Sequence, residues 1–521
     1  MIELGQQRAA VIGLGESGLA MARWLARKGA SVQVFDDRAE PPGLAALREA
    51  VPGAVFACRP LDAGLLDGED APTLLAWSPG VSIVTGSAAA LHAAAQARGV
   101  PVLGELDFFM DEVARQREAG HAARVVAITG TNGKTTVTRM TAFLANEAGV
   151  EAEAAGNIGP SMLDAMMRRL DAGTVTMPAL WVLELSSFQL AVAQPPACDA
   201  SVVLNITPDH LDWHGTMQHY RAAKLRIHDA SGRRIINLDD ALADPDLPAP
   251  WDQPAPQDEA APGKGRARRK PEEAPPPRPR TDFLLRPPTT APAFGLVREG
   301  GLAWLTEAMA EEGTGGRRRR AEPVNILLNR LMPAEALRVQ GAHNHANVLA
   351  ALGLLRACGV PMAAMLHALR AFVPDDHRCA PAGIVGDIEY INDSKGTNIG
   401  ATVAALEGLG RRAVLIAGGV GKDQDFSLLA PAVAAHARAV VLIGRDAALL
   451  KAALQDTGVP LHEAADMDAA VQRAASLAQA GDVVLLSPAC ASFDMFSGYA
   501  ERGRVFVEAV QRLATEAGQP C

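Results

Sequence analysis

The sequence predicts an α/β protein with mainly parallel sheets and about three domains. First, 521 residues are too many for one hydrophobic core. Second, short apolar runs alternate along the chain with Ala- and Leu-rich stretches of helical pattern. Third, two glycine-rich loops each follow an apolar run and precede a helical stretch, as loops at the carboxyl ends of parallel strands do.

The composition narrows the class of protein. Hydrophobic residues make up 49% and charged residues 21%, which is ordinary for a globular domain. The net charge of −10 argues against a general affinity for nucleic acid or an anionic membrane surface. Residues 1–10 lack a signal-peptide pattern, and no apolar run reaches the roughly 18 residues needed for membrane insertion. The six scattered cysteines, without a C-x-x-C pair, favour a reducing, cytoplasmic setting.

The first glycine loop, in VIGLGESGLA (11–20), has the spacing G-x-G-x-x-G at Gly13, Gly15 and Gly18. A second apolar run ends near Asp36, eighteen residues after Gly18. This is the dinucleotide-binding fingerprint, in which N–H groups at a helix N-terminus hold a diphosphate. On these residues alone, an NAD-dependent oxidoreductase is one interpretation, and a protein that binds another diphosphate ligand is the other.

Several apolar runs further along the chain are typical of buried parallel strands. They are RVVAITG (124–130), LWVLEL (180–185), ASVVLNIT (200–207), RAVLIAGG (412–419), RAVVLIG (438–444) and DVVLLSP (482–488). Open parallel sheets bind ligands beyond the carboxyl ends of their strands, so we expect the functional residues there.

The second glycine loop, VVAITGTNGKTT (125–136), is a stronger signal than the first. Its backbone N–H groups can surround a phosphate, Lys134 can neutralise β- and γ-phosphate charge, and the Thr135 hydroxyl can ligate Mg²⁺. Ile128 stands where the strict Walker pattern has glycine, so the loop is a shortened variant.

Acidic and histidine residues follow two of the predicted strands. Glu184 lies within an apolar strand, where a lone carboxylate is costly unless it is paired or bound to a metal. LNITPDHLDWHG supplies two aspartates and two histidines at the end of the next strand, among them His210. Together with Thr135 these are ligand types for nucleotide-bound Mg²⁺, although a histidine alone is weak support for such a site.

One stretch breaks the alternation of strands and helices. Between Pro245 and Pro292 lie 14 of the 35 prolines, in and around GKGRARRKPEEAPPPRPR. This composition predicts neither sheet nor helix. With EEGTGGRRRR (311–320) it is interpreted as a pair of surface insertions, which are either solvated loops or basic contact sites for an acidic partner. We expect deletion of residues 246–290 to leave activity intact.

The motifs GTNGKTT, ELSSFQL, NITPDHLDWHG, YRAAKLRI and GAHNHANVLAAL occur in the order in which the Mur ligases carry them. The chain therefore resembles that family over nearly its whole length, apart from the two insertions. In the last third, DDHRCA, YINDSKGTN, AGGVGKDQDF and LLSPACASFDMF resemble the Mur ligases that add D-glutamate.

The resemblance implies three domains, which we expect at 1–118, 119–373 and 374–521. The first is a Rossmann-like UDP-binding domain, and the second is a P-loop ATPase-like domain with insertions near 245–292 and 308–322. The third is a Rossmann-like domain that binds D-glutamate.

The implied activity is the ATP-dependent addition of D-glutamate to UDP-N-acetylmuramoyl-L-alanine through an acyl phosphate, in cytoplasmic peptidoglycan precursor synthesis. ATP and two Mg²⁺ ions are the implied cofactors, and we expect a monomer. A different Mur-type or folylpolyglutamate-type carboxylate–amine ligase is the alternative, which only the C-terminal motifs argue against. A non-catalytic nucleotide-binding protein is a third interpretation, and the full set of candidate residues weighs against it.

The resemblance also implies site residues, which fall into five groups. Catalytic positions match Lys134, Asn157, His210 and Lys224, and metal ligands match Thr135, Glu184, His210 and Lys224, the last as a carbamate. ATP positions match Gly130, Thr131, Asn132, Gly133, Lys134, Thr135, Thr136, Asn344, Asn347, Arg378, Asp393 and Lys395. UDP positions match Gly15, Glu16, Ser17, Asp36, Asp37 and Ser78. D-Glutamate positions match Thr397, Lys422, Ser492, Phe493 and Tyr499.

For some of these residues the sequence alone favours a plainer role. A lysine on a helix, as Lys224 is, would by default be solvated. Phe493 and Tyr499 are equally open to being core residues. The family pattern has phenylalanine at the position of Tyr499 and often serine at that of Thr135.

Overall fold

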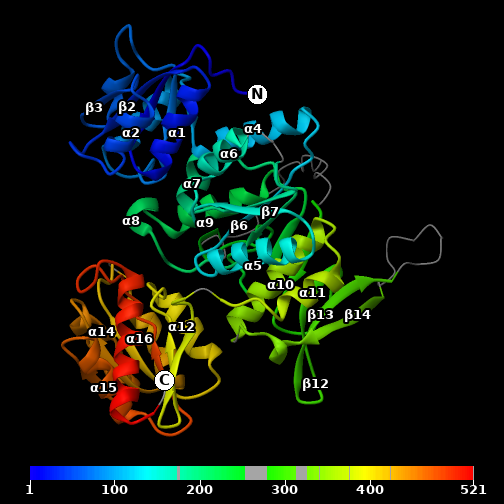
Figure 1. Cartoon of the computed structure of the whole chain (residues 1–521), viewed down its shortest axis with the longest axis vertical. Coiled ribbons are helices and arrows are strands. Elements are labelled where there is room, and N and C mark those ends of the chain that lie inside the picture. Colours follow the sequence, from blue (N-terminus) through cyan, green and yellow to red (C-terminus); the bar gives the residue numbers. More distant parts are fainter. Residues whose placement is uncertain are drawn as a thin grey trace, which may run out of the picture.

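A computed structural model of the chain describes residues 1–172, 177–252, 278–311, 325–339, 341–374, 376–422 and 424–519. These residues form three α/β units, which Figure 1 shows one after another along the longest axis of the molecule. Each unit is built on its own sheet, of five, nine and six strands in chain order. The expected three-domain α/β architecture is therefore confirmed.

The N-terminal unit is a parallel sheet of order β3-β2-β1-β4-β5, the first five strands of a Rossmann arrangement. Its strands are β1 (Arg8–Ile12), β2 (Ser31–Asp36), β3 (Val55–Cys58), β4 (Leu74–Trp77) and β5 (Val102–Leu103). Its helices are α1 (Glu16–Arg27), α2 (Leu44–Ala50), α3 (Ser87–Ala97) and α4 (Glu105–Glu118). The apolar run of β1 is almost wholly buried, which explains why it reads as a strand without alternation.

The central unit is a sheet of order β14-β13-β12-β11-β10-β9-β6-β8-β7. Its strands are β6 (Arg124–Thr129), β7 (Ala152–Gly156), β8 (Leu180–Glu184), β9 (Ala200–Val203), β10 (Arg234–Asn237), β11 (Arg280–Phe283), β12 (Ala293–Glu299), β13 (Leu302–Ala310) and β14 (Ile326–Pro333). Its helices are α5 (Lys134–Glu147), α6 (Met162–Asp171), α7 (Ser187–Val192), α8 (Leu211–His214), α9 (Met217–Leu225), α10 (Ala342–Ala357) and α11 (Met362–Leu369).

The expectation that the proline-rich stretch forms no sheet is wrong for β11. This strand pairs in parallel with β10 on one side and with β12 on the other. Pro279 and Pro287 lie outside the four strand residues, so neither removes a ladder hydrogen bond. Phe283 is buried at 1% exposure and fixes the strand to the core. The remainder of that stretch, 253–277, and residues 312–324 of the second tract lie outside the described residues.

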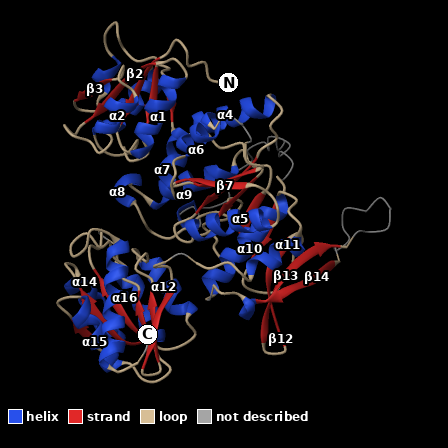
Figure 2. Ribbon diagram, in the orientation of Figure 1, coloured by secondary structure: helices blue, strands red, loops and turns tan. Residues whose placement is uncertain are grey.

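The sheet is not parallel throughout. Strands β12, β13 and β14 pair antiparallel and extend one edge of the central sheet, as Figure 2 shows. The second expected insertion, 308–322, overlaps this hairpin, because β13 runs to Ala310. Residues 308–310 therefore belong to the strand, and the polar tract expected at 311–320 begins directly after it.

The C-terminal unit is a sheet of order β15-β16-β20-β17-β18-β19, parallel except for the edge pair β15–β16. Its strands are β15 (Ala380–Val385), β16 (Ile388–Asn392), β17 (Ala413–Gly418), β18 (Ala437–Ile443), β19 (Leu461–Glu463) and β20 (Val483–Leu486). Its helices are α12 (Ile399–Gly408), α13 (Ala430–His436), α14 (Ala447–Leu454), α15 (Met467–Leu477) and α16 (Tyr499–Glu516).

The N-terminal and central units share one hydrophobic core. Helix α4 carries Phe108 and Phe109 into it, and the Phe109 ring meets the edge of Trp181 at 5.2 Å between centroids. An ion pair of 2.7 Å joins Arg23 of α1 to Asp164 of α6. The continuous core predicts that these two units unfold together.

No helix among the described residues combines the length and the apolar character that a membrane span requires.

Candidate active site

Two adjoining pockets lie where the central and C-terminal units meet. One has a volume of about 390 Å³ and the other of about 790 Å³, and residues such as Asn132, Arg378 and Lys395 line both. The walls come from the carboxyl ends of β6, β8 and β9 on one side and of β16 and β17 on the other. This is the position in which open parallel sheets bind ligands.

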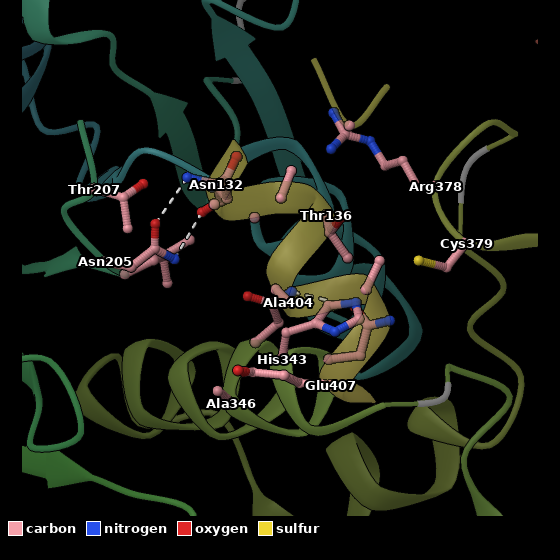
Figure 3. Close-up of a pocket in the computed structure, with 18 of the residues that line it drawn as sticks. Asn132, Thr136, Asn205, Thr207, His343, Ala346, Arg378, Cys379, Ala404 and Glu407 are labelled. Atoms are coloured by element: carbon pink, nitrogen blue, oxygen red, sulfur yellow. Dashed lines mark hydrogen bonds between the residues drawn. The ribbon is translucent and has the colours of Figure 1, made fainter. Parts of the chain in front are cut away.

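The second glycine loop forms the floor of both pockets. It connects β6 to α5, and Gly133 caps the helix with a φ of +83°. A Cβ atom at Gly133 would lie 2.6 Å from Asn347 Oδ1, so only glycine allows α10 to pack this closely. The side-chain oxygen of Asn205 accepts from the N–H of Asn132, and its amide donates to the Asn132 carbonyl (Figure 3). Asn205 therefore fixes the loop at Asn132, and α10 packs against it at Gly133.

Lys134 is the first residue of α5 and lies against its own loop. Its Nζ donates to the carbonyl oxygens of Gly130 at 2.9 Å and Thr131 at 2.8 Å. Burial lowers the pKa of Lys134, against the opposing charges of Glu184 and Asp209. A lysine held at a helix N-terminus in this way is suited to an anionic ligand such as a phosphate.

Lys224 lies beneath the same loop, and the default expectation of a solvated side chain is wrong. It stands on α9 with 2% exposure, and its Nζ donates to the Gly130 carbonyl at 2.8 Å. Burial and the neighbouring Lys134 hold the pKa of Lys224 well below its ordinary value. Asp209 and Glu184 are the nearby opposing charges. Lys224 Nζ also lies 3.5 Å from Thr129 Oγ1 at the end of β6, a placement that periodicity alone does not reveal.

Glu184 ends β8 in the wall of the larger pocket and is buried at 1% exposure. Its Oε1 accepts from Asn157 Nδ2 at 2.8 Å, while Oε2 has no hydrogen-bond partner among the described residues. An orphaned buried carboxylate oxygen fits a cation ligand, and Thr135 and His210 line the same pocket. In the described parts of the chain, no three His, Cys, Asp or Glu side chains come together as a complete metal centre. The residues present thus fit Mg²⁺ held jointly with a ligand's own oxygens.

His210 caps the short helix α8 with a left-handed φ of +56°. The Asp209 carboxylate lies 3.6 Å from its Nε2, and the Phe188 ring lies 4.8 Å from its ring centroid. Burial lowers the pKa of His210, and Lys134 adds to that effect while Asp209 opposes it. The neutral imidazole is the form that can ligate a metal.

The smaller pocket contains the asparagine pair on α10. Asn344 and Asn347 are both 6% exposed, and the Asn347 amide donates to Asn344 Oδ1 at 3.2 Å. They lie on one face of the helix, as their three-residue spacing predicts. Figure 3 shows His343 of the same helix beside Ala404 and Glu407 of the C-terminal unit.

The C-terminal unit brings charged residues to this pocket. Burial raises the pKa of Asp393 to about 7, although hydrogen bonds from Ser487 and Cys379 and the charge of Arg378 lower it. The Lys395 Nζ lies 3.7 Å from the centroid of the Tyr499 ring, a cation–π contact. Arg378 lines both pockets from the connection between the units.

The five residues expected at D-glutamate do not all gather. Thr397, Lys422 and Tyr499 line the larger pocket, and Lys422 has a left-handed φ of +51°. Ser492 and Phe493 are absent from the lining of that pocket; Ser492 is buried and Phe493 is 74% exposed. The interpretation of Phe493 as a core residue is therefore wrong, and Tyr499 at 37% exposure is not core either.

The residues expected at UDP lie in the N-terminal unit and not in these pockets. Gly13 has a φ of +86°, and a Cβ at Gly18 would lie 2.1 Å from the Gly13 carbonyl oxygen, so both must be glycine. Asp36, 1% exposed, accepts from the Leu14 N–H at 2.8 Å and from the Arg38 guanidinium. Burial raises its pKa, but the hydrogen bonds from Arg38 and Leu14 outweigh this and lower it to about 2.

The other residues expected at UDP surround that first loop. They are Gly15, which caps α1, Glu16 and Ser17 in its first turn, exposed Asp37, and buried Ser78 after β4.

Sequence reasoning missed two residues of the site, Asn205 and Asn398. Asn205 holds the loop, and Asn398 bonds to both Asn132 and Asp209 across the two units. Asp209, one of the two aspartates expected in LNITPDHLDWHG, pairs with His210. Asn205 also follows β9, where a polar residue at a strand end could have been suspected. Asn398 lies 266 residues from Asn132, and no local pattern relates them.

Family models match all three units. The Mur ligase MurD-like N-terminal domain matches residues 7–104, the Mur ligase middle domain matches 128–245, and the Mur ligase glutamate ligase domain matches 377–490.

Curated relatives match over nearly the full length. A UDP-N-acetylmuramoylalanine--D-glutamate ligase of Ralstonia nicotianae is 50% identical over 517 residues, which cover 98% of this chain and 97% of the relative. One of the same name from Burkholderia mallei is 48% identical over the same share. In fold, the chain is similar to a UDP-N-acetylmuramate-alanine ligase from Thermotoga maritima, with a TM-score of 0.51, 19% identity and coverage of 97% and 100%. The chain belongs to the Mur ligase family.

Proposed function

We propose that this chain is an ATP-dependent ligase that joins D-glutamate to UDP-N-acetylmuramoyl-L-alanine, giving ADP and phosphate. The single observation that carries the proposal is the larger pocket, in which a phosphate-binding loop from one unit faces Lys422 and Thr397 from another. The relatives of that name, matched from end to end, support the choice of amino acid.

ATP would lie across the two adjoining pockets. Its phosphates would occupy the loop 130–136, with Lys134 leaving its contacts to the loop carbonyls to neutralise their charge. The adenosine would enter the smaller pocket, which Asn344 and Asn347 line from the central unit and Asp393 lines from the C-terminal unit. Arg378 and Lys395 come from the other side of the junction, so they would reach the phosphates only while the units are together.

Thr135, Glu184 and His210 would hold Mg²⁺ together with oxygens of the ligands, and a carbamate on Lys224 would complete the set for two ions. When bound, Mg²⁺ supplies neutralisation of the charge that spreads over the transferred phosphoryl group. The free Oε2 of Glu184 is the observation that supports a cation there. Asn157 would orient the other oxygen of Glu184.

The reaction requires little proton transfer from the protein. The alanyl carboxylate attacks the γ-phosphorus of ATP, ADP leaves, and a mixed carboxylic–phosphoric anhydride remains. D-Glutamate first loses a proton from its ammonium group to solvent, and the neutral amine attacks the acyl carbon. The C–O bond to phosphate then breaks, the leaving phosphate takes up the second proton of the nitrogen, and an amide forms. The chain positions the reactants and supplies positive charge through Lys134 and residues of the C-terminal unit.

The carbamate on Lys224 is the finer part of the proposal. Burial favours the neutral amine of Lys224, which is the form that adds CO₂. Addition of CO₂ to the neutral amine forms an N–C bond and releases one proton to solvent. The carbamate anion next to Lys134 would then make a buried ion pair.

D-Glutamate carries two carboxylates, for which the larger pocket offers the Lys422 ammonium and the Thr397 hydroxyl, with Tyr499 beside them. Ser492 and Phe493 are proposed to join this pocket when the ligand is bound. At the other end, the loop 13–18 would hold the UDP diphosphate, with Asp36 and Asp37 on the uridine side.

We further propose a monomer acting in the cytoplasm, where ATP and nucleotide-linked precursors are made. Free thiols at Cys58, Cys198, Cys358, Cys379 and Cys490 support a reducing setting.

The proposal is tested by ADP release with UDP-N-acetylmuramoyl-L-alanine and a panel of amino acids. We expect D-glutamate to stimulate release far more than L-glutamate, L-lysine or meso-diaminopimelate. Stimulation by another amino acid would favour a different ligase of the family, and stimulation by none would overturn the proposal.

A further inference from the structure

The first turn of α12, in the C-terminal unit, packs directly against the phosphate-binding loop of the central unit. Asn398, 7% exposed, caps α12, and its amide donates to Asn132 Oδ1 at 3.1 Å. The Asn132 amide donates back to Asn398 Oδ1 at 3.3 Å. A weaker bond of 3.4 Å runs from the Asn398 amide to the Asp209 carboxylate. One side chain thus touches both the loop and the neighbour of His210.

Asn398 serves its own helix at the same time. Its Oδ1 accepts from the Ala401 N–H at 2.9 Å, which is the usual N-cap hydrogen bond. The same oxygen therefore holds both the start of α12 and the Asn132 amide. A change in the position of the C-terminal unit would break the bonds to the loop without breaking the cap.

Gly400, the second residue of α12, permits this approach. A Cβ atom there would lie 2.7 Å from Thr207 Oγ1 and 3.3 Å from Asn132 Nδ2. Its backbone is ordinary helix, so glycine is not needed for conformation, and alanine would favour the helix itself. The glycine serves the contact between the units.

The other end of α12 repeats the arrangement against α10. A Cβ at Gly408 would lie 3.1 Å from His343 Nδ1 and 3.4 Å from the Cα of Gly341. Figure 3 shows Asn132 toward one end of α12 and Glu407 toward the other, with His343 beside it. At each end of α12 a glycine, Gly400 or Gly408, allows the helix to lie close to the central unit.

We propose that α12 is the docking element that places the C-terminal unit on the phosphate-binding loop. Asn398 is its positioning residue, and Gly400 is the residue that makes the contact possible. The catalytic consequence rests on the proposed function, because it assumes that the loop binds ATP. Lys395 and Thr397 lie just before the helix, so docking would then align Lys395 with the nucleotide and Thr397 with D-glutamate.

Two substitutions separate docking from folding. Gly400→Ala adds a methyl group that blocks docking but favours α12. Asn398→Asp keeps the cap acceptor, loses both donors, and sets a carboxylate against Asp209. We expect each to lower kcat by about tenfold to a hundredfold through misalignment. Gly53→Ala is the matched control, since no atom lies within 4 Å of an added Cβ there.

A second variant tests the steric partner. Thr207 contacts Thr131 through its backbone N–H and carbonyl, so Thr207→Ala leaves those bonds in place. Thr207→Ala does remove the Oγ1 atom with which the methyl group of Gly400→Ala would collide. Because Thr207 itself lines the smaller pocket, the double variant Gly400→Ala/Thr207→Ala is compared with Thr207→Ala alone. In that background Gly400→Ala should lower kcat much less than it does in the wild type.

The full-length variants are compared by kcat, by melting temperature and by small-angle X-ray scattering with a non-hydrolysable ATP analogue. We expect a larger radius of gyration and a lower kcat for Gly400→Ala and Asn398→Asp, with the melting temperature of Gly400→Ala unchanged or higher. Wild-type kcat and compactness in both variants would overturn the proposal. So would a loss of melting temperature that parallels the loss of activity and that Thr207→Ala does not reverse. If the wild type shows no D-glutamate-dependent ADP release, the proposed function fails, whereas the scattering comparison still decides the docking.

Discussion

The Lys224 Nζ lies 2.8 Å from the carbonyl oxygen of Gly130, the residue that opens the second glycine loop. A lysine in this position, with no carboxylate in direct contact in the described structure, costs free energy if it is charged. A chemical role of the side chain would explain why a lysine is found here in spite of this cost.

Lys224→Met keeps the bulk of the side chain but cannot add CO₂. We expect the variant to fold and to lose about a hundredfold or more in kcat, as loss of a metal ligand does. In Lys224→Ala, which leaves space where the side chain was, added short carboxylates should restore part of the activity. ¹³CO₂ should give a carbamate signal in the NMR spectrum of the wild type only. Full activity of Lys224→Met without rescue would contradict the carbamate.

Lys134→Ala should abolish ligation and leave the fold intact. The Lys134 ammonium bonds only to carbonyls of its own loop in the described structure, so its loss costs little stability. We expect kcat to fall by at least about 10²–10³-fold, the usual effect of removing one group that stabilises the transition state, which leaves no product in a short incubation. Lys451→Ala, which breaks an exposed ion pair with Glu463 far along the chain, is the control and should be unaffected. Near-normal turnover of Lys134→Ala would show that the loop does not bind the phosphates.

Asp393 makes stability depend on pH. Burial raises its pKa to about 7 in the folded chain from an ordinary 3.8, so unfolding releases a proton between these values. The free energy of unfolding should therefore fall as pH rises, by about 2 kcal/mol from this residue between pH 5 and 7. Urea unfolding at both pH values should show this fall in the wild type and a smaller one in Asp393→Asn. Equal slopes in the two proteins would mean that Asp393 is already ionised at pH 5.

Fewer residues can be removed from the proline-rich stretch than its composition suggests. Removing residues 246–290 also removes β11, which pairs with strands on both sides, so we expect insoluble protein. Replacing only 253–277 with a short Gly/Ser linker keeps every described strand and should keep wild-type kcat. Soluble, active protein from the longer deletion would show that β11 is dispensable. Loss of activity from the shorter one would assign the replaced residues a role.

The sequence predicts much of the fold and the parts of the site that depend on local pattern. Glu184 stands out as an acidic residue in an apolar strand, and Lys134 stands out behind a glycine loop. Both are local signals, and the structure places both side chains in one pocket. The glycine fingerprint also indicates a Rossmann-like N-terminal unit, and the sheet order β3-β2-β1-β4-β5 agrees with this prediction.

What escapes the sequence depends on packing between distant elements. Lys224 is buried because α9 lies under the loop, and β11 forms because two neighbouring strands are already in place to pair with it. Phe493 is exposed although its type favours the core. Asn398 matters only because two units meet, and helical or strand periodicity carries no information about such a meeting.

Mass spectrometry of the product tests the central claim most directly. Purified protein is incubated with UDP-N-acetylmuramoyl-L-alanine, ATP, Mg²⁺ and D-glutamate, and the molecular mass of the nucleotide-linked product is measured. The account predicts a product heavier by one glutamate residue, formed with one ADP per amide and absent in Lys134→Ala. An unchanged substrate mass, or a mass increase with another amino acid and none with D-glutamate, would contradict it.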